Sequence, residues 1–429
     1  MESVNIKYGE TSVDMTIHGA KSIKYLQGSP MKEIENLREA FLYEITQNCV
    51  DSPALSKLIS KDDLVTIVVS DITRFWMRQD KICKLLVEYL AEELKVPYKN
   101  IVILIALGNH RKMTEEEMKK VVSPEIYEKV KVYNHNSSAP DLKYVGTTPR
   151  GTEVYVHPLA VDRKLILIGA TVYHIIAGFG GGRKSILPGI SSKKTINQNH
   201  MNSLDPNEAM SNPLVGLGKL KNNPVNEDMI DAASLINPTF GINLIVDSHS
   251  KHCNLLCGHW LKAWEKSCEL VNEYFGVPIE KKADIVIASA GGYPKDISLY
   301  QSVKTLSNAA QALKKGGTMI LLTECREGGG APDYFDWIKS LKKGTLDTDL
   351  RASFTIPGYV FYATCEYINR FRDVFMLTQI PQEMVKDMNL KTYTGINDLL
   401  AQVDFTGKDV YVIPYGGNTV PIFRENSEN

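Results

Sequence analysis

Short runs of apolar, β-branched residues alternate with segments of helical spacing along most of the chain. Leu64–Ser70 and Asn100–Ala106 are predicted to be buried strands, because they are apolar at most positions over no more than seven residues. An amphipathic segment follows each of them, over Lys81–Leu94 and from Thr114, where Thr-Glu-Glu-Glu forms a capping box. The same pattern predicts strands at Lys129–Tyr133 and Lys164–Ile168. This alternation indicates an α/β domain with a largely parallel sheet.

A second series of the same kind begins near residue 283. Strands at Ala283–Ser289 and Thr318–Thr323 flank a helix expected over Leu299–Lys314, which ends before Gly316-Gly317. One more strand is predicted at Asp409–Pro414. The predicted fold class is therefore α/β, with two domains, largely parallel sheets and an interdomain cleft.

The domain boundary is placed between these two series. We expect an N-terminal domain over residues 1–270 and a smaller C-terminal domain over 275–404. The last segment, 405–429, is expected to return to the first domain, because chain ends often lie near one another.

Composition narrows the choice of partners. The 429 residues include 49 Lys plus Arg and 50 Asp plus Glu, a net charge of −1, which argues against a general nucleic-acid or polybasic membrane binder. No signal peptide is visible, and the most apolar stretch, Leu165–Phe179, is shorter than a membrane span. Seven scattered cysteines, an odd number, suit a reducing compartment. We expect a cytoplasmic protein that binds neither nucleic acid nor membrane.

Polar residues cluster where the predicted strands end, which is where open α/β sheets bind ligands. Three such groups are present, and we expect them to line one cleft. They are Asp71, Thr73 and Arg74; Asn109, His110 and Arg111; and Tyr293, Lys295 and Asp296.

A glycine-rich segment, Gly178-Phe-Gly-Gly-Gly-Arg-Lys-Ser185, is the most informative motif. Four glycines in five positions let backbone N–H groups approach an anion closely. The segment is not a nucleotide-triphosphate P-loop, because Arg183 stands where that motif needs glycine and Pro188-Gly189 interrupts the helix that must follow. It is predicted to be a phosphate-type cradle of another kind.

Three histidines, His110, His174 and His200, flank turns of the same predicted cleft. Neutral imidazoles at neutral pH supply either acid–base pairs or metal ligands. Composition and spacing do not assign which histidine does which.

Together these motifs resemble the nickel-dependent lactate racemases and their 2-hydroxyacid racemase and epimerase relatives. The resemblance runs from about residue 70 to residue 304. The motifs that carry it are Ser70-Asp-Ile-Thr-Arg74, Gly108-Asn-His-Arg111, the glycine segment within His174–Gly189, Asn199-His200, and Leu299-Tyr-Gln-Ser-Val-Lys304.

The resemblance implies a nickel-pincer nucleotide, a pyridinium mononucleotide whose two sulfur-bearing arms and a ring carbon grip nickel. Lys184 matches the lysine that is tethered to this cofactor, and His200 matches the protein ligand of the nickel. His110 and His174 match the two acid–base histidines. The remaining implied contacts are Asp71, Thr73, Gly180, Gly181 and Gly182 with the cofactor, and Arg74, Tyr300, Gln301 and Lys304 with the substrate.

The implied reaction inverts C2 of a 2-hydroxyacid such as lactate. In the family a hydride moves to the cofactor while one histidine takes the hydroxyl proton, and return to the other face inverts the centre. The implied partners are the small 2-hydroxyacid substrate and the host proteins that make the cofactor.

Two departures from the family pattern point to a larger or more polar substrate, such as a sugar acid. Bulky residues, Phe75-Trp-Met-Arg78, follow Arg74. An expected tryptophan is also absent from Pro357–Phe361, where Tyr359 or Phe361 is a candidate replacement, and Trp337 is the only tryptophan in that region. A sugar-acid (aldonate) 2-epimerase of the same family is therefore the main alternative. Two other hypotheses have less support. A non-catalytic phosphate- or nucleotide-binding protein would leave His110 and His174 without a function, and a kinase-like enzyme would need the intact P-loop that this chain lacks.

Overall fold

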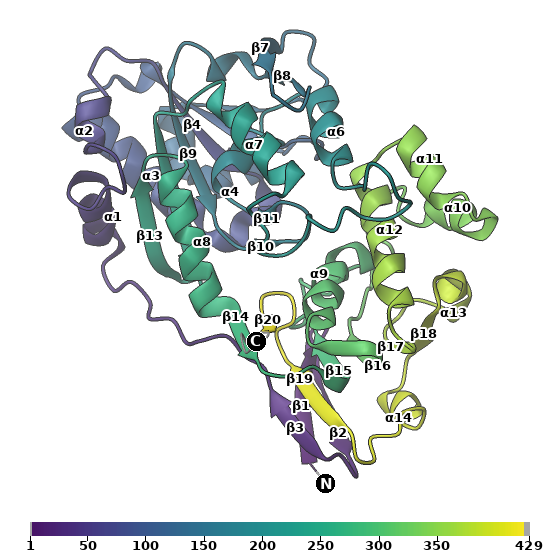
Figure 1. Ribbon diagram of the computed structural model, residues 1–429. Helices are drawn as coiled ribbons and strands as arrows, with labels where there is room; N and C mark the ends of the chain where they lie inside the picture. The colour runs from purple at the N-terminus through teal and green to yellow at the C-terminus, as the bar shows by residue number, and fades with distance from the viewer. Residues whose placement is uncertain (1, 424–429) are drawn as a thin grey trace, which may run out of the picture. The chain divides into compact units, whose positions relative to one another are not determined.

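The computed structural model describes residues 2–423, which divide into two compact units (Figure 1). The central unit contains residues 30–203 and 213–272. The terminal unit contains both ends of the described chain, residues 2–29, 204–212 and 273–423. The predicted fold class of two α/β domains with largely parallel sheets is confirmed.

The division of the chain differs from the one expected. Strand β19 (Asp409–Ile413) does not return to the first domain but pairs in parallel with β15 (Ala283–Ser289), and β3 (Ser22–Tyr25) pairs with β19 on its other side. Near the chain end, β20 (Val420–Phe423) pairs with β14 (Gly276–Ile279). Backbone hydrogen bonds between strands distant in sequence therefore place both chain ends in the terminal unit. Residues 424–429, part of the segment expected to return, lie outside the described residues.

The central unit is built on a six-stranded sheet in the order β13-β12-β9-β4-β5-β6. Its strands are β4 (Val65–Ser70), β5 (Ile101–Ala106), β6 (Lys131–Asn134), β9 (Lys164–Ala170), β12 (Phe240–Val246) and β13 (His252–Gly258). All neighbours are parallel except β12 and β13. Because β4, β5 and β9 are buried almost throughout, they read as continuous apolar runs in the sequence, as strands covered on both faces do.

The terminal unit has a second six-stranded sheet, entirely parallel, in the order β18-β17-β16-β15-β19-β3. The remaining strands are β16 (Leu313–Leu322), β17 (Asp373–Leu377) and β18 (Leu390–Tyr393). Helix α9 (Leu299–Ala310), capped by the Ser298 side chain, packs against β15 and β16 (Figure 1). At the start of the described chain, β1 (Glu2–Tyr8) and β2 (Thr11–Ile17) form an antiparallel hairpin, whose apolar face joins the core of this unit.

Helices complete both units, and the central unit also has two short β-hairpins. The central unit has α1 (Leu37–Thr46), α2 (Leu55–Leu58), α3 (Gln79–Glu88), α4 (Glu115–Val122), α5 (Pro124–Lys129), α6 (Lys193–Met201), α7 (Pro224–Ser234), the hairpins β7 (Lys143–Thr147) with β8 (Glu153–Val156) and β10 (Tyr173–His174) with β11 (Gly178–Phe179), and α8 (Lys262–Phe275), which crosses the boundary at residue 272. The terminal unit adds α10 (Ile338–Lys343), α11 (Leu346–Ala352), α12 (Ile356–Asn369), α13 (Gln382–Val385) and α14 (Ile396–Leu400). Among the described residues, no helix has the length and apolarity needed to cross a membrane.

Each sheet has one place where the strand order reverses direction. In the central unit the chain runs outward from β4 to β5 and β6, then returns to place β9 on the other side of β4. In the terminal unit β16, β17 and β18 lie on one side of β15, and β19 lies on the other. Ligands of open α/β sheets bind beyond the carboxyl ends of the strands at such switch points. The switch points are therefore β4/β9 and β15/β19.

Candidate active site

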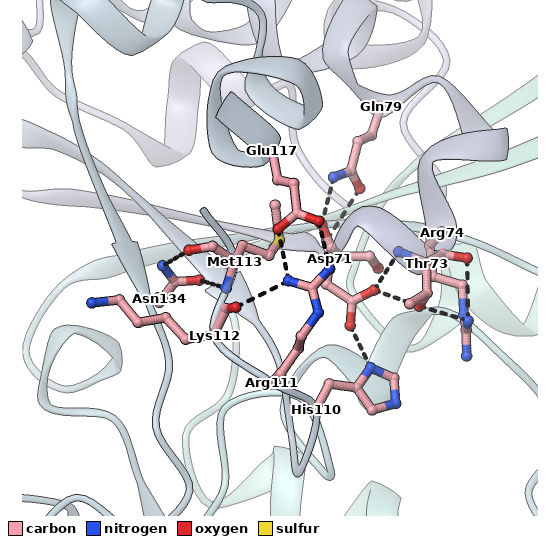
Figure 2. A network of polar contacts seen from close by, with 11 residues as sticks. Asp71, Thr73, Arg74, Gln79, His110, Arg111, Lys112, Met113, Glu117 and Asn134 are labelled. Carbon is pink, nitrogen blue, oxygen red and sulfur yellow. Dashed lines mark hydrogen bonds and ion pairs between the residues drawn. The ribbon is translucent and has the colours of Figure 1, made fainter. Parts of the chain in front are cut away.

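Asp71 and His110 meet at the carboxyl ends of the adjacent parallel strands β4 and β5 (Figure 2). The Nδ1 atom of His110 lies 2.5 Å from Oδ2 of Asp71. The Asp71 side chain is 5% exposed, whereas that of His110 is 50% exposed. The carboxylate therefore fixes one side of an imidazole ring whose other side is open to a ligand.

Asp71 is surrounded by hydrogen-bond donors. Its Oδ1 accepts the backbone N–H and the hydroxyl of Thr73, at 2.8 and 2.5 Å, which caps the 3₁₀-helix η1 (Ile72–Met77). Burial by itself raises the pKa of Asp71, but the bonds from His110 and Thr73 and the charge of Arg74 outweigh it, so the pKa lies below the ordinary value. Asp71 is thus an ionised carboxylate that accepts a hydrogen bond from the Nδ1–H group of His110.

Arg74 lies beside this pair and donates to the Thr73 hydroxyl and carbonyl oxygen at 2.9 and 3.3 Å (Figure 2). Arg111, in contrast, forms two hydrogen bonds with Glu117, which is the capping-box residue of α4. This pairing lowers the pKa of Glu117 to about 2. Arg111 therefore stabilises a helix start, and Arg74 is the arginine positioned near the histidine.

The three polar groups expected to share a cleft belong to two units. The groups around Asp71 and His110 follow adjacent strands of the central sheet, as expected. Tyr293, Lys295 and Asp296 follow β15 of the terminal sheet instead.

The glycine segment follows β9 and forms the one-turn 3₁₀-helix η5 (Gly182–Ser185). Gly182 has a φ of +52°, and a Cβ atom there would lie 2.5 Å from Cγ of Trp264. Only glycine fits, because the loop both adopts a left-handed conformation and packs directly on an indole ring. This packing places Lys184 beside the switch point of β4 and β9, both of which contact η5.

Arg183 is fully buried beneath the loop and does not face a ligand. Its guanidinium donates to the carbonyl oxygens of Phe179 and Ala177 and to the side chain of Asn226, at 2.6–3.0 Å. Its Cζ atom also lies 3.8 Å from the ring centroid of Trp264. Burial lowers the pKa of Arg183 to about 9. Arg183 thus holds the loop in shape from below.

His174 and Lys184 are in contact. Nδ1 of His174 accepts the backbone N–H groups of Ile176 and Ala177, each at 3.1 Å. Its Nε2 lies 2.9 Å from Nζ of Lys184. The turn between β10 and β11 therefore orients the imidazole so that Nε2 faces the lysine.

His200 lies near the end of α6 and is 2% exposed. Its Nδ1 donates to the carbonyl oxygen of Ile196 at 2.9 Å, so Nε2 carries the lone pair that a metal ligand needs. Burial first, and then the charge of Lys184, lower its pKa to about 3, which keeps the ring neutral. Groups of three or more His, Cys, Asp or Glu side chains able to hold a metal do not occur among residues 2–423.

A buried network behind His200 was not anticipated from the sequence. The Asp228 carboxylate, 0% exposed, accepts hydrogen bonds from the hydroxyls of Thr148 and Thr152 and from the Asn199 amide. Asn199 precedes His200, so this network fixes the turn of α6 that carries the histidine. The Asn-His dipeptide was noted in the sequence, but an aspartate 29 residues away gave no local signal.

The predicted substrate residues of the terminal unit lie on α9. Nζ of Lys304 donates to Oε1 of Gln301 at 3.2 Å, as residues three positions apart on a helix can. The ring of Tyr300 packs edge to face against Tyr334, with centroids 6.2 Å apart.

Most of the bulky residues that depart from the family pattern belong to the core. Met77 is 1% exposed, and Phe75 packs against the central core between Lys120 and Arg78. Only Trp76, 37% exposed, keeps a large apolar surface in contact with solvent. The candidate aromatic replacements in α12 are buried as well, Tyr359 at 3% and Phe361 at 0%. The ring of Phe361 packs against the buried Tyr334 and is part of the core of the terminal unit.

Two family models and two curated proteins match this chain. The lactate racemase N-terminal domain matches residues 8–211, and the lactate racemase C-terminal domain matches residues 279–420. The lactate racemase of Thermoanaerobacterium thermosaccharolyticum is 34% identical over 347 residues, which cover 80% of this chain and 79% of that protein. The lactate racemase of Lactiplantibacillus plantarum is 32% identical over 290 residues, 67% of this chain and 66% of that protein.

A solved structure extends the likeness to the whole fold. The lactate racemase apoprotein of Thermoanaerobacterium thermosaccharolyticum has a TM-score of 0.87 and 30% identity, covering 99% of this chain and 100% of that one. Both family domains, in their order along the chain, together with this fold, lead to one conclusion: the chain belongs to the lactate racemase family.

Proposed function

We propose that this protein is an isomerase that inverts C2 of a 2-hydroxyacid, lactate or a close relative, with a nickel-pincer nucleotide tethered to Lys184. The observation that carries the proposal is the pair of oriented histidines, His110 held by Asp71 and His174 held by backbone amides, at the carboxyl edge of one sheet. Membership of the lactate racemase family supports the reaction class.

The side chains present fit such a cofactor. His200 offers a neutral imidazole whose Nδ1 is already bonded, and soft sulfur donors together with imidazole suit nickel. Lys184 extends from a glycine loop of the kind whose backbone amides bind anions. This loop follows β9, and Asp71 and Thr73 follow the neighbouring parallel strand β4. When bound, the cofactor accepts and returns a hydride at C2, which avoids a poorly stabilised carbanion.

His110 acts as one acid–base group. Because ionised Asp71 can only accept, the proton on Nδ1 of His110 is held there, and Nε2 presents its lone pair to the substrate hydroxyl. The carboxylate also stabilises the imidazolium formed when Nε2 takes that proton, as in other Asp–His pairs.

His174 acts as the second acid–base group. Its Nδ1 is occupied by two backbone N–H groups, so Nε2 is the nitrogen that gives or takes a proton. Inversion needs one proton-transfer group for each face of the planar intermediate, and these two rings approach from the ends of different strands. Nε2 also lies next to Lys184, where the cofactor would be attached.

Arg74 is the proposed anchor of the substrate carboxylate. Its guanidinium donates to the Thr73 hydroxyl, which in turn donates to Asp71 of the Asp71–His110 pair. Arginine binds carboxylates with two parallel hydrogen bonds. Tyr300, Gln301 and Lys304 of α9 are proposed to contact the carboxylate and hydroxyl as well. Trp76, which is exposed and lies two positions after Arg74 in the sequence, favours a substrate with more carbon atoms than lactate, which keeps the sugar-acid epimerase as the alternative.

The test is racemisation by protein produced in a host that makes the cofactor. D- and L-lactate and a panel of sugar acids are incubated separately, and enantiomers or epimers are separated by chiral chromatography. We expect inversion of at least one acid, and a loss of at least about 100-fold in kcat for His110→Ala and for His174→Ala with the Lys184 adduct retained. Normal turnover by both variants would contradict the two-histidine mechanism.

A further inference from the structure

We propose that the terminal unit holds a separate binding site for a carboxylate or phosphate group, formed by Lys295, Thr305 and the backbone of Gly417. The site lies at the β15/β19 switch point, and it does not depend on the racemase proposal. Neither the acid–base histidines nor the cofactor residues take part in it.

Two glycine-bearing loops meet at this place. Gly291 follows β15 and Gly417 follows β19, and the two strands are paired in parallel up to Ala288 and Ile413. The second loop is fastened on both sides: Gly416 N–H donates to the Ser289 carbonyl at 2.7 Å, and its own carbonyl accepts from Asn308 at 2.6 Å. The loops are therefore held firmly at the edge where parallel sheets bind ligands.

Lys295 extends between these loops. Its Cδ atom lies 3.9 Å from the position that a Cβ atom would occupy on Gly291, and equally far from that position on Gly417. The lysine stem therefore runs along two residues that have no side chain. Among residues 2–423, no carboxylate, carbonyl or aromatic ring is a partner of its ammonium group. Burial lowers the pKa of Lys295, and no neighbouring charge opposes this effect. A largely buried cation without a counter-ion is unfavourable, and a bound anion would compensate it.

Thr305 contributes a second donor. Its side chain is 1% exposed, and its hydroxyl oxygen has no hydrogen-bond partner. The hydroxyl oxygen lies 3.9 Å from the position that a Cβ atom would occupy on Gly417. The stem of Lys295 approaches the same glycine. The backbone N–H of Gly417 likewise has no acceptor within the described part of the chain. Buried polar groups are normally satisfied, so an unpaired hydroxyl near the stem of a lysine whose ammonium is also unpaired indicates a missing acceptor.

The donors define the ligand. An ammonium, a hydroxyl and a backbone N–H together match the oxygen atoms of a small anion, whereas they would repel a cation. Carboxylate and phosphate share this chemistry. The carboxylate source is a hydroxyacid such as lactate, and the phosphate source is free phosphate or a phosphorylated metabolite.

Isothermal titration of inorganic phosphate, and separately of sodium lactate, into the cofactor-free protein at low salt tests the site. We expect saturable binding of at least one of them, weakened about tenfold or more in Lys295→Gln and severalfold in Thr305→Val, because hydrogen bonds to charged groups are lost. The matched control is Lys314→Gln, which removes a lysine of the same unit that pairs with Asp284 at 2.8 Å and should bind as wild type does. Phosphate alone responding to Lys295→Gln identifies the phosphate source, and lactate alone identifies the carboxylate source.

Equal binding by wild type and Lys295→Gln, or no saturable binding of either anion, would overturn the proposal. A folding control accompanies the titrations. Because Lys295→Gln removes a buried charge without a counter-ion, its thermal midpoint without anion should equal or exceed that of wild type. A clear fall in that midpoint would mean that the lysine is structural, which also overturns the proposal.

Discussion

The Nδ1 atom of His110 lies 2.5 Å from Oδ2 of Asp71, across the ends of two adjacent parallel strands. The short contact joins a half-exposed ring to a buried carboxylate, so the aspartate sets both the orientation of the ring and the position of its proton.

Asp71→Asn should therefore impair chemistry more than folding. An amide that donates toward Nδ1 would favour the wrong tautomer, so kcat should fall about 100-fold or more. The rate is measured on protein with a matched amount of Lys184 adduct. Asp80→Asn is the control. Asp80 lies in the first turn of α3 and pairs with Arg78, so this variant should keep the wild-type kcat. An unchanged kcat in Asp71→Asn would remove the aspartate from the mechanism.

His135 makes stability dependent on pH. It is 2% exposed, its Nε2 donates to the Ser191 carbonyl, and burial lowers its pKa from 6.5 to about 4. The folded state therefore binds a proton at His135 less readily than the unfolded state does. The contribution of neutral His135 to the free energy of unfolding is complete above pH 6.5 and is lost as pH falls toward 4. The loss amounts to up to about 3 kcal/mol.

Urea unfolding at pH 7.5, 5.5 and 4.5 checks this dependence. His135→Gln should lose less stability than wild type between the first and last pH, whereas His249→Gln, at a side chain 79% exposed, should follow wild type. Parallel pH profiles for wild type and His135→Gln would show that another group causes the loss.

His200→Ala should lower nickel content. The ring is the proposed protein ligand, and its removal should reduce nickel per chain by about tenfold or more, as loss of a metal contact typically does. His135→Ala is a matched control, because it also removes a buried histidine of the central unit but not a proposed ligand. Nickel content equal to that of wild type in His200→Ala would exclude His200 from the metal site.

Arg183→Lys should destabilise the central unit although the charge is kept. Lysine cannot reproduce the bonds to Ala177, Phe179 and Asn226 or the stacking on Trp264, and we expect a loss of about 3 kcal/mol. Urea unfolding measures it against Arg150→Lys, where a partly exposed arginine pairs with Glu227. A difference below about 0.5 kcal/mol between the two variants would mean that Arg183 does not hold the loop.

The hydrophobic pattern predicted local elements well and their grouping poorly. Strands such as β4, β5 and β15 appear where their apolar runs lie, because burial on both faces leaves a clear local signal. The placement of β3 and β19 in one sheet depends on hydrogen bonds between residues nearly 390 positions apart, such as Ser22 with Asp409. No local pattern encodes that pairing.

The candidate site shows the same division. His110, His174 and Lys184 could be proposed from the sequence because they stand in short motifs at strand ends or turns. Arg183 looked like part of an anion cradle, yet its side chain turns inward, which depends on Trp264 eighty-one positions later. The tertiary neighbours of a loop decide whether an arginine faces a ligand or the core.

Intact mass together with nickel analysis, on protein from a host that makes the nickel-pincer cofactor, tests the central claim most directly. We predict a nucleotide-sized adduct on Lys184 and about one nickel per chain, both absent in Lys184→Ala and the adduct retained in His110→Ala. An unmodified mass without nickel in wild-type protein, from a host shown to load another family member, would contradict the proposed cofactor.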